Sequence, residues 1–116
     1  MLEIQVEHHD DHTICRPIGD LDAFTVATFR EALVSFSDVS NLVIDLCDVP
    51  FMDSAGIGAL IRGIRRAQER DGSVALACNR PALCRLLETT GFDRIVTVAP
   101  TLEDAVQSLD LFARRT

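Results

Sequence analysis

Short apolar runs alternate with amphipathic segments along most of the chain. Residues 42–47 are almost continuously apolar, as expected of a buried parallel strand. Beyond a short loop, apolar side chains recur at helical spacing from Ile57 to Ala67, and arginines occupy the opposite side. Between the two lies Ser54, whose hydroxyl can accept a backbone N–H two or three residues later. The pattern therefore predicts a strand, a short loop and a helix that Ser54 caps.

Two glycines, Gly56 and Gly58, fall in the first turn of this predicted helix. A glycine inside a helix costs roughly 1 kcal/mol relative to alanine. Two glycines in one turn indicate that another group needs to approach this backbone closely.

The rest of the chain repeats the alternation of strand and helix. The remaining elements are predicted as strands at residues 3–7, 13–18, 74–78 and 95–99, and helices that begin near Asp22, Pro81 and Thr101. Polar residues 8–12 are typical of a hairpin turn. The order predicts an α/β fold: a mixed, mainly parallel sheet of about five strands, with an N-terminal antiparallel hairpin and four helices. Residues 1–116 are expected to form a single domain. Strand order, and the face that the helices cover, stay open.

Charge and hydropathy narrow the range of functions. The net charge is −7, from 11 basic and 18 acidic residues, and no basic patch stands out. Nucleic acid is therefore not an expected partner, since its binding rests largely on phosphate neutralisation. No apolar run approaches the ~20 residues that span a bilayer, and residues 1–4 do not resemble the start of a signal peptide. The expected location is the cytoplasm, with no membrane partner.

Cysteines and histidines are the side chains here that most readily bind metals. None of the four cysteines forms a CxxC pair. They are expected to be buried and reduced, and a metal site or redox switch is the alternative. His8, His9 and His12 stand beside Asp10 and Asp11 in the hairpin turn, but neighbours on a turn rarely converge on one ion. No metal site and no cofactor are predicted.

Ser54 does not stand in a recognisable catalytic motif. The nucleophile elbow Gly-x-Ser-x-Gly requires glycine where Met52 stands, and all three histidines precede residue 13, so no catalytic base is apparent. The dinucleotide fingerprint requires glycine where Ile61 stands, and there is no Walker motif. We expect no enzymatic activity, and a small serine hydrolase is the alternative from that class.

Ser54 is better suited to be a substrate of another protein. It stands at the tip of a predicted loop and is followed by small residues, so a kinase can reach it. Phosphorylation would add about −1.5 to −2 charges at one point. The helix N-terminus would stabilise part of that charge, whereas a desolvated interface beside carboxylates would not. The residue types predict an on/off switch for protein binding.

These motifs together resemble those of a known family. Residues 43–46 and 51–56, followed by Leu60, are similar to the signature of bacterial anti-sigma factor antagonists, the STAS domain family. The run Gly19-Asp20-Leu21-Asp22 matches the second motif of that family, and Gly91 stands where its late helix ends. The resemblance covers essentially the whole chain.

The resemblance implies a function, partners and site residues. The unphosphorylated chain would bind an anti-sigma factor, a serine kinase that supplies its own ATP and Mg²⁺, and so release a sigma factor. That kinase would phosphorylate Ser54, and a phosphatase would reverse the reaction. A STAS module of another signalling complex is the alternative. The residues expected to bind the partner are Gly19, Asp20, Asp22, Asp53, Ser54, Ala55, Gly56, Ile57 and Gly58.

Overall fold

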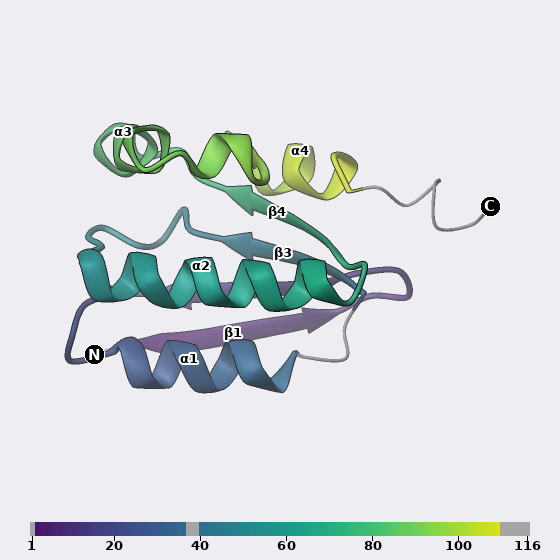
Figure 1. Cartoon of the computed structure of the whole chain (residues 1–116), viewed down its shortest axis with the longest axis horizontal. Coiled ribbons are helices and arrows are strands. Elements are labelled where there is room, and N and C mark those ends of the chain that lie inside the picture. The colour runs from purple at the N-terminus through teal and green to yellow at the C-terminus, as the bar shows by residue number, and fades with distance from the viewer. Residues whose placement is uncertain (1, 37–39, 110–116) are drawn as a thin grey trace.

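A sheet of five strands organises the computed structural model, which describes residues 2–36 and 40–109 (Figure 1). The strands lie side by side in chain order, β1-β2-β3-β4-β5. β1 pairs with β2 in antiparallel register, and every later pair is parallel. The strands are β1 (Glu3–His8), β2 (Thr13–Ile18), β3 (Asn41–Asp45), β4 (Ser73–Ala77) and β5 (Thr97–Ala99). The predicted mixed sheet with an N-terminal hairpin is confirmed.

The helices cover both faces of the sheet. Because each parallel strand adds to the same edge, right-handed crossovers place the three connecting helices on one face. These are α1 (Val26–Ser35), α2 (Ser54–Glu69) and α3 (Pro81–Thr89), and a 3₁₀ turn, Phe92–Arg94, follows α3. After the last strand, α4 (Leu102–Gln107) packs against β3, β4 and β5 on the opposite face. Neither the strand order nor this division of the helices had been predicted.

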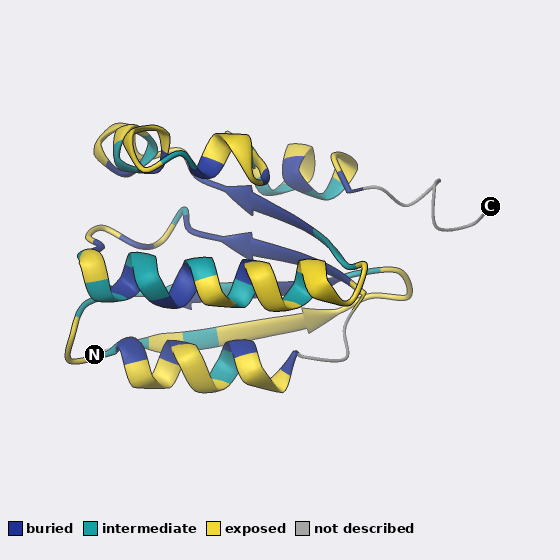
Figure 2. Ribbon diagram, in the orientation of Figure 1, coloured by how far each residue is buried: buried dark blue, intermediate teal, exposed yellow. Residues whose placement is uncertain are grey.

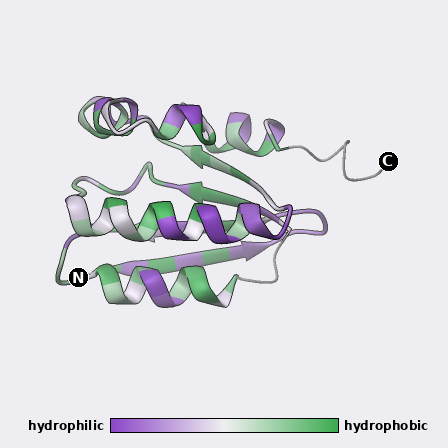
Figure 3. Cartoon of the chain, viewed as in Figure 1, coloured by the Kyte–Doolittle hydropathy of each residue, from purple (hydrophilic) through white to green (hydrophobic). Residues whose placement is uncertain are grey.

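The core lies on both sides of the central strands, which are the most buried elements (Figure 2). Leu42, Ile44 and Leu76 pack under α1, α2 and α3, whereas Val43 and Ala75 face α4. All of β3 is buried, and Figure 3 shows β3 and β4 as predominantly apolar. The edge strand β1 is far more exposed. Along β1, Ile4 is partly buried, whereas Val6 is 41% exposed.

The first turn of α2 packs directly on the loop that follows β2. A Cβ added at Gly56 would lie 2.6 Å from the Leu21 carbonyl oxygen and 2.8 Å from Met52 Cγ. Leu21 and Met52 also form an isolated parallel bridge, so this backbone has little freedom to move. At Gly58 the added Cβ would meet no described atom within 4 Å. The close approach expected at both glycines therefore occurs only at Gly56, and the group that approaches is the Leu21 loop of this chain.

The two glycines provide a matched test of this packing. Gly56→Ala should lower the free energy of unfolding by about 1–3 kcal/mol, because the methyl group collides with fixed backbone. Gly58→Ala should leave it unchanged or raise it by up to about 1 kcal/mol, because alanine is the better helix former. Urea unfolding of both variants measures the difference. Equal effects of the two substitutions would contradict the packing at Gly56.

Candidate functional site

Two loops meet at the carboxyl edge of the sheet and hold the sequence motifs together. The Leu21 N–H donates to the Phe51 carbonyl oxygen at 2.9 Å, and the Asp53 N–H donates to the Leu21 carbonyl oxygen at 3.1 Å. These bonds continue the pairing of β2 with β3 beyond the ends of both strands. Residues 19–22 and 51–58 therefore lie side by side, at the edge where open α/β sheets usually hold their sites.

Asp53 caps α2, and its carboxylate also holds the neighbouring loop. Asp53 Oδ1 accepts the N–H groups of Ala55 at 2.9 Å and Gly56 at 3.2 Å. Its Oδ2 accepts the N–H of Ala23 at 3.2 Å, in the connection between β2 and α1. The prediction that Ser54 caps the helix is wrong. Aspartate is as good a cap as serine, and here it stands one residue earlier and occupies the donors.

Ser54 is the first residue of α2, and it is exposed. Within the described part of the chain its hydroxyl has no hydrogen-bond partner. Among its neighbours, Ala55, Ile57 and Gly58 are partly exposed, whereas Gly56 is buried beneath the Leu21 loop. The arrangement leaves a free nucleophilic hydroxyl on a surface of small side chains.

The earlier motif contributes one structural carboxylate and one exposed carboxylate. Asp22 Oδ1 accepts the N–H groups of Phe24 at 2.9 Å and Thr25 at 3.1 Å, as turn-forming aspartates do. Asp20 is exposed, and its backbone oxygen accepts the Thr25 hydroxyl at 2.8 Å. Gly19 has a positive φ of 117°, which a side chain would strain. Asp22 and Gly19 therefore shape the loop, and Asp20 adds negative charge to its surface.

Two phenylalanines on these loops were missed by the sequence analysis. Phe24 is 97% exposed and Phe51 is 52% exposed. The sequence could have indicated that Phe24 is exposed, because it precedes the apolar stripe of α1, which begins at Val26. Phe51 was read only as part of the motif. Aromatic side chains are enriched at protein–protein interfaces relative to the rest of the surface, so the exposure of Phe24 and Phe51 marks a candidate binding surface.

The histidines lie at the other end of the sheet from Ser54. The β1–β2 turn that carries them is opposite the start of α2 in Figure 1, and the length of β2 separates the two. In the turn, His12 Nδ1 contacts Asp11 Oδ1 at 2.7 Å, and the rings of His9 and His12 stack. The described residues include no group of three or more side chains placed to hold a metal ion. No helix among them is both long and apolar enough to cross a bilayer.

Single substitutions of Asp53 and Ser54 should show which of the two residues stabilises the start of α2. Asp53→Ala should lower the free energy of unfolding by about 1–2 kcal/mol, because three backbone donors lose their acceptor. Ser54→Ala should change it by less than about 0.5 kcal/mol, since the hydroxyl bonds to nothing described. Thermal and urea unfolding compare the two. A larger loss for Ser54→Ala would restore serine as the cap.

Comparison with known proteins gives a consistent family. The pattern of the STAS domain family matches residues 3–105. An anti-sigma-B factor antagonist of Listeria monocytogenes is 30% identical over 100 residues, which cover 84% of this chain and 88% of that protein. The crystal structure of an anti-sigma factor antagonist from Mycobacterium paratuberculosis has a TM-score of 0.87 at 27% identity, with 94% of each chain covered.

A more distant structure shares the fold. The Bacillus cell fate determinant SpoIIAA in its phosphorylated form has a TM-score of 0.70 at 22% identity, over 90% of this chain and 97% of that one. The anti-sigma factor antagonist family is non-enzymatic, which agrees with the expectation that this chain catalyses no reaction. The chain belongs to the STAS domain family, and its relatives there are anti-sigma factor antagonists.

Proposed function

We propose that the protein is an anti-sigma factor antagonist whose binding is switched off by phosphorylation of Ser54. The observation that carries the proposal is the exposed Ser54 hydroxyl, which bonds to no described group and stands at the first position of α2. The proposal is also supported by membership of the STAS domain family, in which a similar protein is an anti-sigma-B factor antagonist. The partner would be an anti-sigma factor with serine kinase activity, supplying ATP and Mg²⁺, and a phosphatase would restore binding.

The unphosphorylated surface is suited to close contact. Ala55 and Gly58 offer almost no side chain, so the backbone of a partner can approach the helix. Phe24 and Phe51 stand on the adjoining loops as apolar anchors, and aromatic anchors contribute much of the affinity of protein interfaces. Together these residues form the proposed docking face, defined as Phe24, Phe51, Ser54, Ala55 and Gly58.

The phosphate would act through charge that the helix end compensates only in part. The N–H groups of Ala55 and Gly56 already bond to Asp53 Oδ1, so they are not free for a phosphate on Ser54. The Asp53 carboxylate and the exposed Asp20 add negative charge on the same edge. In water the phosphate remains solvated and the fold is kept. Beneath a partner it would be desolvated beside like charge, which costs several kcal/mol.

A charge-only comparison at Ser54 tests the switch. Ser54→Asp should weaken binding to the cognate anti-sigma factor at least about tenfold, which is 1.4 kcal/mol. Ser54→Asn, which has nearly the same shape without the charge, should bind appreciably more tightly than Ser54→Asp. Ser54→Ala should bind like the parent and accept no phosphate from the kinase with Mg-ATP. Calorimetric titration and phosphate incorporation measure these effects, with unfolding curves to show that all variants fold.

Two results would overturn the switch. Parent-like affinity of Ser54→Asp would show that charge at this position does not control binding. Equal weakening by Asn and Asp would assign the effect to side-chain bulk instead.

The docking face makes a separate prediction at Phe24. Phe24→Ala should weaken binding to the same anti-sigma factor about tenfold or more, with no loss of stability because the ring is 97% exposed. Val34→Ala is the matched control, because it also removes an exposed apolar side chain, 48% exposed, but at the far end of α1, away from the docking face. Equal effects of the two substitutions would remove Phe24 from the docking face.

A further inference from the structure

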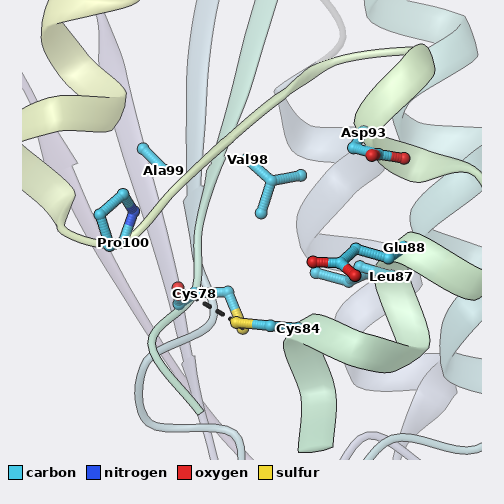
Figure 4. A pocket seen from close by; sticks show the side chains of 8 residues that line it. All are labelled: Cys78, Cys84, Leu87, Glu88, Asp93, Val98, Ala99 and Pro100. Carbon is cyan, nitrogen blue, oxygen red and sulfur yellow. Dashed lines mark hydrogen bonds between the residues drawn. The ribbon is translucent and has the colours of Figure 1, made fainter. Parts of the chain in front are cut away.

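Two cysteine sulfurs touch each other beside a pocket on the carboxyl side of β4 (Figure 4). Cys78 follows the last residue of β4, and Cys84 lies in α3. The Cys84 thiol contacts Cys78 Sγ at 3.2 Å and the Cys78 carbonyl oxygen at 3.4 Å. A disulfide bond is about 2.05 Å long, so closure needs a movement of only about 1 Å. Both thiols are free.

The pocket gives small molecules a route to this pair. It has a volume of about 310 Å³. Leu87 and Val98 line it, and Figure 4 shows Glu88 and Asp93 around it with the two sulfurs in contact at its base. Cys84 is partly exposed, whereas Cys78 is only 2% exposed. The carboxylates disfavour anionic reagents, so a small neutral oxidant is the best fit.

We propose that Cys78 and Cys84 are an oxidation site that a hydroperoxide converts to an intramolecular disulfide. The Cys84 thiol gives up its proton, the resulting thiolate attacks the peroxide, and the O–O bond breaks. Cys84 becomes a sulfenic acid, and the hydroxide that leaves takes up the proton to become water. The Cys78 thiolate then attacks the Cys84 sulfur, the S–S bond forms, and the S–O bond breaks to release hydroxide, which takes up a proton. In total two thiols lose two electrons and hydrogen peroxide becomes two waters.

Exposure decides the order of the two steps. The accessible Cys84 meets the peroxide first, and the buried Cys78 resolves the intermediate. Burial raises the pKa of the Cys78 thiol to about 11, so its thiolate is scarce at neutral pH and the second step should accelerate as pH rises. Cys15 is fully buried, and burial raises its thiol pKa to about 12. Cys78 and Cys84 should therefore be oxidised in preference to Cys15, because their sulfurs touch and Cys84 is accessible.

The bond would act on the same edge of the sheet as Ser54. It would fasten the end of β4 to α3, because Cys78 precedes Arg80 in the sequence and Cys84 follows it. The Arg80 Nε donates to the Cys47 carbonyl oxygen at 2.9 Å, in the loop that leads from β3 to α2. Oxidation would therefore stiffen the loop that carries Arg80, which is hydrogen-bonded to the loop before Ser54. The oxidation proposal does not depend on the anti-sigma function.

The sequence allows a direct test by peptide mapping. Trypsin cuts after Arg70 and Arg85 but not at Arg80, which precedes proline, so residues 71–85 form one peptide that holds Cys78 and Cys84 and no other cysteine. The folded, reduced full chain is treated with hydrogen peroxide at pH 7 and pH 8.5, alkylated without reductant and digested. We expect this peptide to be unalkylated and two hydrogen masses lighter than its form with two thiols. The disulfide should form faster at pH 8.5 than at pH 7, and reduction should restore both thiols.

Matched variants and competing products make the test decisive. Cys84→Ser should abolish the lighter peptide, whereas Cys15→Ser and Cys47→Ser should leave it unchanged. The proposal is wrong if peptide 71–85 stays fully alkylated, if Cys78 links to Cys47, if dimers joined by disulfides appear, or if Cys84 is oxidised further without forming the bond.

Discussion

The Asp53 carboxylate binds backbone N–H groups from two loops, and the geometry of the site depends on that one side chain. Its Oδ1 closes the first turn of α2, and its Oδ2 holds Ala23 after β2. The same turn presses Gly56 against the Leu21 carbonyl oxygen, where a side chain has no room. Capping and packing thus act together: they fix where α2 begins, and so they fix the position of Ser54.

Under the proposed function, the same arrangement would let a phosphate on Ser54 change binding without changing the fold. The Ala55 and Gly56 N–H groups at the helix start already bond to Asp53, so the Ser54 hydroxyl contributes little to stability and is free to be modified. The loops that carry Phe24 and Phe51 are held by hydrogen bonds, which would reduce the entropy lost when a partner docks. Under the proposed function, stability and affinity therefore depend on adjacent but different residues.

The carboxyl edge of the sheet carries more chemistry than the Ser54 motif. Cys78 and Cys84 touch at the end of β4, and Arg80 connects their loop to the one that follows β3. Parallel strands direct all their outgoing loops to the same edge, so loops that are distant in sequence become neighbours there. The proposed phosphorylation site and the proposed oxidation site therefore lie in separate loops that one edge of the sheet supports.

The sequence by itself determined the secondary elements, the hairpin, the mainly parallel sheet and the Ser54 motif, because these follow from local periodicity and residue type. The apolar spacing read from Ile57 to Ala67 also agrees with the structure, in which Leu60 and Ile64 are buried in the core. Only the tertiary structure decided that Asp53 is the cap, that Gly56 serves internal packing, and that Phe24 is exposed. Each of these depends on which groups lie opposite one another across the two loops. Asp53 and Ser54 are adjacent capping candidates, and Gly56 and Gly58 lie in one turn. Within each pair the local sequence does not separate the two residues, which differ only in the groups that the other loop places next to them.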